Sequence, residues 1–224
     1  MTPRSRPNRQ SLRALLASCR AVVLIEFAFT LPLLLLLGLT GIELTNYVIT
    51  RMRISQIALH LADNAARIGT GTQLQQKTIN EVDVNDLLTG AGYQAGALDL
   101  FERGRVIVSS VENDPANNGR YRIRWQRCRG AKNYDSPHDN NKTNLAGVGP
   151  AGRQVIAAPD GATMWVEVAY DYRPVLGVDL MPDVEMLESA SMMVRDRRAL
   201  TPASNVDANG DGVLEVQGEQ ASTC

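Results

Sequence analysis

One uninterrupted apolar segment, residues 21–42, constrains this chain more than any other feature of its sequence. The segment has 22 residues and a single charge, Glu26, and it is almost pure leucine from Leu31 to Leu39. As an α-helix it would span roughly 33 Å, about the thickness of the hydrocarbon core of a bilayer. A surface helix of a soluble protein would show a polar face, and this segment shows none. The sequence therefore predicts a transmembrane helix over residues 22–42.

A secretory signal peptide is the alternative interpretation of this segment. Signal peptides also begin with basic residues, but their apolar region has about 7–15 residues and ends in a small-residue cleavage site. The present segment is longer and runs directly into a second helix-like stretch. We therefore expect a membrane anchor that the protein keeps.

Charges lie unevenly on the two sides of the apolar segment. Residues 1–20 contain five arginines and no acidic residue, whereas Glu43 follows the segment directly. Because cytoplasmic flanks are rich in Lys and Arg, this places residues 1–20 in the cytoplasm and residues 43–224 on the far side of the cytoplasmic membrane. The net charge of the chain is −1, so its overall field does not indicate a nucleic-acid partner.

The start of the apolar segment also carries a specific residue pattern. An arginine-rich leader is followed by a small residue, four mostly apolar residues, Glu-Phe, and a leucine-rich span with an early proline. The residues concerned are Arg20-Ala21, Ile25-Glu26-Phe27-Ala28, Thr30-Leu31-Pro32 and the run Leu33–Leu37. The pattern resembles the TadE/TadG-like family, the minor pilins or pseudopilins of tight-adherence (Flp-type) pilus systems. The resemblance covers residues 18–45 well and the rest only loosely, through Tyr-Arg-Pro at 172–174.

This resemblance implies a structural role in the assembly of a type IV pilus, in the bacterial inner membrane or in the pilus itself. The implied partners are the membrane, other pilin-like or pilus assembly subunits, and a prepilin peptidase that would cut between Ala21 and Val22. Glu26 would then be the fifth residue of the mature chain and pair with the N-terminal amine of a neighbouring subunit, an attraction that low dielectric strengthens. Alternatively, Glu26 lies at the membrane interface and has no role. The family usually has Gly before the cut, where this chain has Ala21, and an uncut chain would remain a single-pass membrane protein.

Residues 43–68 predict an amphipathic helix, because they contain no Pro or Gly and carry an apolar stripe at steps of three and four that Arg51 interrupts. The stripe consists of Tyr47, Ile54, Ala58, Leu61, Ala65 and Ile68. Gly69 and Gly71 are expected to end the helix. With the apolar segment it would form one helix of about 47 residues. The stripe packs either on the protein's own globular part or on neighbouring subunits, and both can hold on different faces.

Residues 69–224 predict one small α+β head built on an antiparallel sheet, on which the long N-terminal helix packs. The expected elements are short helices in 72–90, a flexible connection at Gly90, Gly92 and Gly96, a hairpin of strands 105–112 and 119–127, a polar surface loop over 129–161, a strand over 163–173, a last strand at Met192–Val194, and a C-terminal tail over 199–224. The hairpin turn is rich in Asn, Asp, Pro and Gly, which favour turns.

Period-two alternation assigns faces to two of these strands. One face of 163–173 takes Met164, Val166, Val168, Tyr170 and Tyr172, and the other takes Trp165, Glu167 and Asp171. One face of 119–127 takes Arg120, Arg122 and Arg124, with Arg127 and Arg129 following, and the other takes Tyr121, Ile123 and Trp125. We interpret the arginine row as a solvated sheet face, with a surface for anionic glycans, lipids or an acidic partner as the alternative.

Two of the three cysteines lie on the expected outer side of the membrane. Cys19 falls in the leader, whereas Cys128 and Cys224 fall where disulfides persist, so we predict one Cys128–Cys224 bridge, with two free thiols as the alternative. Such a bridge closes a loop of about 97 residues, for which chain entropy gives roughly 4–5 kcal/mol at best.

Residues 207–215 resemble part of a calcium loop. Asp207, Asn209, Asp211 and Glu215 occupy positions one, three, five and nine, and Gly212 supplies the tight turn. A standard EF-hand has a bidentate Glu at position twelve, where this chain has Gly218. The sequence therefore leaves two interpretations open, a shorter calcium loop and a simple Asn/Asp/Gly turn, and no cofactor is required.

No motif in the chain indicates catalysis. There is no Walker A loop, no dinucleotide fingerprint and no HExxH, and the only histidines are His60 and His138. We expect no enzyme. The alternative to a pilin-like role is an unprocessed, single-pass, membrane-anchored binding or scaffold protein, whose site would be the arginine strand or the 207–215 loop.

Overall fold

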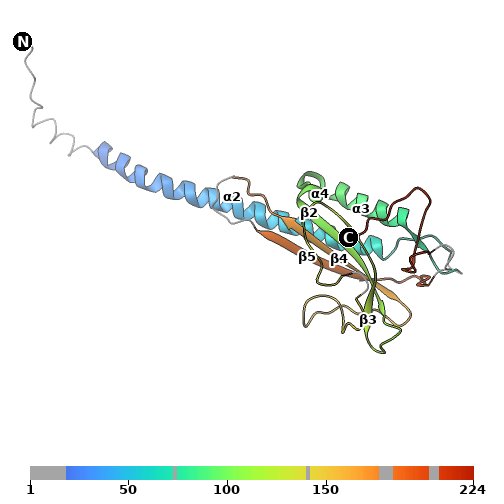
Figure 1. Ribbon diagram of the computed structural model, residues 1–224. Helices are drawn as coiled ribbons and strands as arrows, with labels where there is room; N and C mark the ends of the chain where they lie inside the picture. The colour runs from blue at the N-terminus through green and yellow to red at the C-terminus, as the bar shows by residue number, and fades with distance from the viewer. Residues whose placement is uncertain (1–18, 73–74, 140–141, 177–183, 202–206) are drawn as a thin grey trace, which may run out of the picture. The chain divides into compact units, whose positions relative to one another are not determined.

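The described part of the chain begins with one continuous α-helix, α2, which runs from Cys19 to Ala65 (Figure 1). The computed structural model describes residues 19–72, 75–139, 142–176, 184–201 and 207–224, and within these ranges the side chains from Val22 onwards. Most of the expected leader, residues 1–18, lies outside the described residues. The single helix predicted through the apolar and amphipathic stretches is confirmed, although it ends before residue 68.

The chain forms two compact units. The first contains residues Met1–Asn46 and Pro174–Gly177, and the second contains Tyr47–Arg173 and Val178–Cys224. In the first unit every side chain from Val22 to Ile42 is exposed. This part of α2 is long and apolar enough to cross a membrane, and none of its most apolar stretch is buried in the described protein. So large an apolar surface needs an apolar environment that the described chain does not supply.

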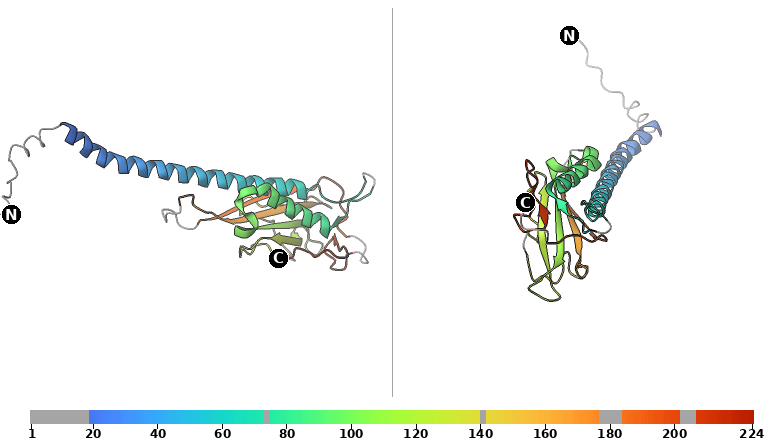
Figure 2. Two further views of the ribbon diagram at one scale, coloured as in Figure 1. Left: turned by 90° about the horizontal axis from the view of Figure 1, so that it is seen from above. Right: turned by 90° about the vertical axis from the view of Figure 1, so that its right-hand side faces the viewer.

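The second unit is built on a four-stranded antiparallel sheet with the order β3-β2-β4-β5 (Figures 1 and 2). The strands are β2 (Gly104–Asn113), β3 (Tyr121–Arg129), β4 (Ala162–Asp171) and β5 (Glu185–Met193). The predicted α+β class, the hairpin and the alternating strand are confirmed. β5 is longer than the expected strand at Met192–Val194. It is an edge strand with exposed glutamate and serine positions, so its apolar alternation is weak in the sequence.

One face of the sheet and the second half of α2 form the main core. The predicted stripe is confirmed, because Ile54, Ala58, Leu61 and Ala65 are all fully buried. The strand side chains that join them include Val106, Val108, Met164, Val166, Val168 and Tyr170. Tyr47 and Ile68 pack at the margin of the same core. Burial of these apolar side chains stabilises the fold by roughly 1.5–3 kcal/mol for each large one.

A second helix, α3 (Glu81–Ala95), covers the same face of the sheet. It begins at a capping box, in which Asn80 Oδ1 accepts from the Asp83 amide and the Asp83 side chain accepts from the Asn80 amide. Our expectation that Gly90 and Gly92 belong to a flexible connection is wrong, because both lie inside this helix. A Cβ on Gly92 would lie 2.5 Å from Cε2 of Phe101, so the glycine lets that ring pack against the helix.

Short elements complete the second unit. They are β1 (Ile79–Asn80), a 3₁₀ turn η1 (Gly96–Leu98), α4 (Leu100–Arg103) and β6 (Val213–Leu214). β6 pairs in parallel with β1, just before α3 begins. Part of the expected C-terminal tail, residues 199–224, is therefore built into the fold, because two short strands far apart in the sequence share hydrogen bonds.

The other face of the sheet carries a smaller core of its own. Val111, Ile123, Val148 and Trp165 are buried together there, with Tyr121, Leu145 and Val155 packed against them. Residues 129–161, expected as a polar surface loop, supply three of these side chains and therefore cover this face. The apolar residues of the loop are few and irregularly spaced, so no periodic pattern in the sequence reveals them.

A β-bulge in β3 changes which face its side chains occupy. Ser110 of β2 pairs with Trp125, but the next residue, Val111, pairs with Ile123, so Arg124 is an extra residue in β3. Trp125 consequently packs in the core under the helices, whereas Ile123 packs in the smaller core. The prediction that these two side chains share a face is wrong, because a bulge breaks the period of two.

Candidate functional site

Beyond the apolar segment, α2 has a second apolar face that the described fold does not cover. Val48, Met52 and Leu59 are each about half exposed. They recur at steps of four and seven residues and so share one side of the helix. The buried stripe that includes Ile54 and Leu61 occupies another side. In the second unit, therefore, α2 packs on its own sheet with one side and presents an apolar side to its surroundings.

The predicted processing and assembly residues lie at the start of α2. The bond between Ala21 and Val22 is within the helix, and Val22 and Glu26 are exposed. The Glu26 carboxylate has no hydrogen bond or ion pair with the described residues. A carboxylate in an apolar helix is costly unless it is paired or reaches the interface. The pairing of Glu26 with the N-terminal amine of a neighbouring subunit therefore stays a prediction.

Glu43, directly after the apolar segment, is bound to a distant loop of the same unit. Its Oε2 atom accepts hydrogen bonds from the backbone N–H groups of Val175, at 3.1 Å, and Leu176, at 3.3 Å. The side chain of Glu43 is only 5% exposed. From the sequence alone Glu43 is only a flanking charge, because no local pattern links it to residues 175 and 176.

The structure brings the two outer cysteines together, as the predicted bridge requires, and holds them as free thiols. The Cys224 thiol donates a hydrogen bond to Cys128, and Arg105 Nη2 lies 3.1 Å from the Cys128 sulfur. The bond from Cys224 and the guanidinium lower the pKa of Cys128 to about 7, and the same contact raises the pKa of Cys224. The C-terminal segment is held here by a 2.8 Å bond from the Cys128 amide to the Ser222 carbonyl. The disulfide itself stays a prediction.

Arg127 is the centre of a buried ion cluster that sequence reasoning missed. Its guanidinium donates to both carboxylate oxygens of Glu81, at the first turn of α3, and at 2.8 Å to Asp211. Burial opposes the charged form, but the bonds to Glu81 and Asp211 outweigh it and raise the pKa of Arg127. The expectation of a solvated arginine face holds for Arg120, which is exposed, and is wrong for Arg127. A carboxylate on a distant helix, invisible to strand periodicity, accounts for the difference.

The predicted calcium residues engage N–H donors in the structure. Asp207 accepts from the amides of Asp211 and Gly212 at 3.0 and 2.9 Å, and Glu215 accepts from the amides of residues 208 and 209. No group of three or more His, Cys, Asp and Glu side chains is placed to hold a metal ion within the described ranges. This geometry favours the simple turn, because amides and Arg127 already occupy the carboxylate oxygens. Calcium binding by Asp207, Asn209, Asp211 and Glu215 stays a prediction.

A serine, a histidine and a glutamate meet on the loop-covered face of the sheet without forming a nucleophile–base pair. The Ser136 hydroxyl donates to Glu167, not to His138. Nε2 of His138 accepts a 2.9 Å hydrogen bond from the Gly149 amide, and burial lowers the pKa of His138. The histidine therefore has its acceptor nitrogen occupied by backbone, an arrangement that holds the loop in place.

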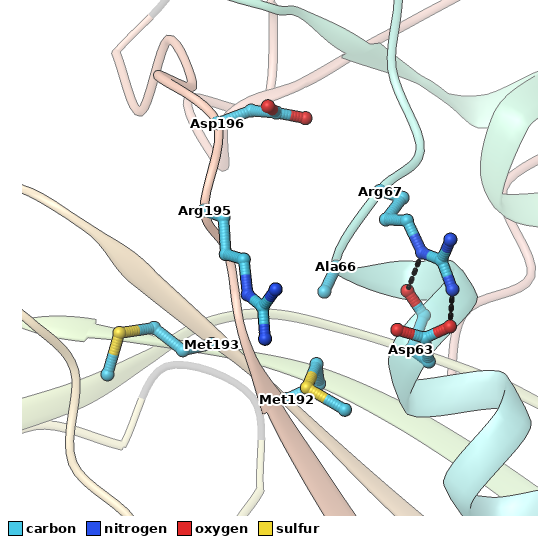
Figure 3. A pocket seen from close by; sticks show the side chains of 7 residues that line it. All are labelled: Asp63, Ala66, Arg67, Met192, Met193, Arg195 and Asp196. Carbon is cyan, nitrogen blue, oxygen red and sulfur yellow. Dashed lines mark hydrogen bonds and ion pairs between the residues drawn. The ribbon is translucent and has the colours of Figure 1, made fainter.

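A cavity of about 310 Å³ lies between the end of α2 and the end of β5 (Figure 3). Its lining residues are Asp63, Ala66, Arg67, Met192, Met193, Arg195 and Asp196. Asp63 and Arg67 pair with each other, and Asp196 pairs with Lys77 at 2.6 Å. None of the candidate site residues predicted from the sequence lines this cavity, and its acidic groups are already matched by cations.

Comparison with known proteins adds no relative. The chain matches no protein-family model, no curated protein sequence and no solved structure.

Proposed function

We propose that this protein is a minor pilin-like or pseudopilin component in the assembly of a tight-adherence type IV pilus. It is a structural protein, not an enzyme, anchored in the bacterial inner membrane by residues 22–42. Its leader, residues 1–21, lies in the cytoplasm, and residues 43–224 lie in the periplasm or outside. Its partners are other pilin-like or pilus assembly subunits and a prepilin peptidase. The proposal joins the resemblance of residues 18–45 to the TadE/TadG-like family with the surface of α2.

The observation that carries the proposal is the exposed apolar surface of one continuous helix. The side chains from Val22 to Ile42 are all exposed, and the exposed apolar side continues through Val48, Met52 and Leu59. A lipid bilayer can cover the first stretch but is too thin to cover the second as well, because the apolar segment alone already spans roughly 31 Å. Helices of neighbouring subunits can cover both, which fits an assembly protein better than an isolated anchor.

Glu26 has a defined task in this proposal. After cleavage between Ala21 and Val22, the new N-terminal amine of one subunit pairs with the Glu26 carboxylate of its neighbour. The pairing is favourable because the surrounding apolar helices lower the local dielectric. It also satisfies a carboxylate that would otherwise be costly in this position.

The first experiment is the intact mass of the protein purified from membranes, together with N-terminal sequencing. A chain that starts at Val22 supports prepilin-type processing and the pilin-like role. A chain that still starts near Met1 favours the alternative, an unprocessed membrane-anchored binding or scaffold protein. An Ala21→Gly variant is the matched control, because it restores the family's usual residue before the cut and should be processed at least as well.

A second experiment tests the charge pairing directly. Glu26→Ala should leave membrane insertion intact, because it removes a charge from an apolar segment, and should abolish co-purification with pilus assembly subunits. Glu26→Asp, which keeps the charge on a shorter side chain, should retain part of it. Unchanged assembly in Glu26→Ala would show that the pairing role is wrong.

A further inference from the structure

The loop at Pro174–Leu176 is bound to α2 at the point where the apolar segment ends. The two backbone N–H groups of Val175 and Leu176 converge on one carboxylate oxygen of Glu43. Glu43 directly follows Ile42, the last residue of the apolar segment. Residues 174–176 also belong to the same compact unit as the first part of α2. A loop far away in the sequence is therefore part of the unit that contains the apolar helix.

The depth of this contact follows from helix geometry. In an α-helix the Cα–Cβ bonds tilt towards the N-terminus, so the Glu43 side chain leans back towards the apolar segment. Residues 22–42 occupy roughly 31 Å, which matches the hydrocarbon thickness of a bilayer. The Glu43 carboxylate then lies at the boundary between hydrocarbon and headgroups. Two N–H donors reduce the cost of placing a carboxylate there, since buried polar groups need partners.

The loop presents apolar side chains at this level. Val175 is 61% exposed, and Pro174 and Leu176 are half-buried. None of the three carries a charge, and Arg173, just before them, is exposed. Apolar side chains next to a basic residue are the composition that favours insertion at the interface of a bilayer with anionic lipids.

We propose that Pro174–Leu176 is a second membrane contact, an interfacial anchor that Glu43 holds against α2. Its partner is the lipid surface at the outer boundary of the bilayer. The inference rests on the proposed membrane span of residues 22–42. One helix alone can rotate about its axis in the membrane, whereas a helix with a side anchor cannot do so freely. The anchor therefore sets which sides of the apolar segment face neighbouring subunits.

The test uses the full chain in vesicles of phosphatidylcholine and phosphatidylglycerol, with and without brominated lipids. Bromine quenches tryptophan emission at short range. Three single variants are compared with the unmodified protein, whose Trp125 and Trp165 are both buried in the fold. Val175→Trp probes the anchor, Leu37→Trp probes the span, and Tyr93→Trp, at a side chain 83% exposed on α3, probes the second unit.

We expect brominated lipids to reduce the added emission of both Val175→Trp and Leu37→Trp and to leave that of Tyr93→Trp unchanged. Quenching of Leu37→Trp without quenching of Val175→Trp overturns the anchor while the span stands. Quenching of neither overturns the span and the anchor together. The failure of the inference is thus distinguishable from the failure of the function on which it rests.

Whether Glu43 positions the loop is tested by the lipid quenching of Trp at 175 in variants of Glu43. Glu43→Ala, added to Val175→Trp, should reduce the lipid quenching of Trp at 175, because the loop loses both hydrogen bonds. The same change added to Leu37→Trp should leave that quenching unaltered, which shows that the helix is still inserted. Glu43→Gln keeps an acceptor oxygen and should restore quenching at 175. Equal quenching in the Ala and Gln variants rules out Glu43 as the group that holds the loop.

Discussion

At the scale of single residues, Glu112 at the end of β2 shows how burial controls a charge. Its side chain is 5% exposed, and Nη2 of Arg122 lies 3.6 Å from its Oε2 atom. Burial raises the pKa of Glu112 to about 7, and Arg124 and Arg122 offset this only in part. The folded protein therefore binds a proton at this carboxyl more tightly than the unfolded chain does.

This shift predicts a loss of stability with rising pH. Because the folded pKa is raised, the stabilisation is fully present below the ordinary value of about 4.5 and is lost as pH rises through about 7. The loss amounts to about 3 kcal/mol at most, at 1.36 kcal/mol for each pKa unit. Glu112→Gln should flatten the free energy of unfolding between these pH values, as measured by urea unfolding. Glu102→Gln, at an exposed site, should leave the slope as it is, and an equal effect of both would contradict the argument.

At the scale of elements, β3 and α3 are joined through the buried pair of Arg127 and Glu81. Both side chains are almost inaccessible, so removal of one leaves the other charge buried without a partner. A surface pair would contribute little, but an uncompensated buried charge is strongly destabilising. The same guanidinium of Arg127 also donates a hydrogen bond to Asp211 and holds that side chain in place.

Arg127→Met should therefore lower the free energy of unfolding by about 3–5 kcal/mol. Arg120→Met, directly before the same strand and exposed, should change it by less than about 0.5 kcal/mol. The double variant Glu81→Gln/Arg127→Met should be more stable than Arg127→Met alone, because only the carboxylate of Asp211, which is less buried than Glu81, then lacks its cation. Denaturant unfolding of the purified protein measures all three variants. Similar losses of unfolding free energy at positions 120 and 127 would show that the Arg127–Glu81 pair does not stabilise the contact between β3 and α3.

The exposed apolar side of α2 is a second property at this scale. Met52→Ser and Leu59→Ser should weaken cross-linking to neighbouring subunits in membranes, because they remove apolar area from the side of α2 that we propose as the contact with those subunits. They should leave the unfolding free energy of the protein nearly unchanged, because neither side chain lies in a core. His60→Ser, at an exposed position about 100° further round α2 than Leu59, is the control. If it weakens cross-linking as much as the two apolar variants, this side of the helix is not the contact.

At the scale of the whole molecule, the C-terminal segment ties distant parts of the chain together. β6 pairs with β1, and Asn85 of α3 donates at 2.8 Å to the carbonyl of Gln220. Ser222 bonds to Asn85 and to the amide of Cys128. These contacts hold Cys224 next to Cys128, so the two thiols are already close enough in the fold to be oxidised to a disulfide.

Oxidation should therefore join Cys128 and Cys224 and raise the free energy of unfolding by about 4–5 kcal/mol at most. Peptide mass spectrometry under non-reducing conditions, in a Cys19→Ser background, should find the two peptides linked. Reduction should lower the melting temperature, and Cys224→Ser should abolish that difference. A melting temperature that does not respond to reductant in the Cys19→Ser protein means that the pair stays reduced.

Much of the architecture was predictable from local patterns. The apolar segment, the buried stripe of α2, the hairpin and the alternation in β4 follow from periods that single stretches of sequence display. The bulge at Arg124 and the apolar contacts of residues 129–161 were not predictable, because neither has a period. The pairing of Arg127 with Glu81 and of Glu43 with residues 175 and 176 joins segments that no local rule connects.

The sequence by itself determined that this protein carries one long helix whose first part is apolar on every side, because the hydrophobicity and length of residues 22–42 need no partner to be recognised. It also determined which two cysteines lie on one side of that segment. Only the tertiary structure decided which charges are buried, which side of α2 remains exposed and which loop meets Glu43. Those outcomes depend on the burial and proximity of residues far apart in the chain, and burial is a property of the packed fold.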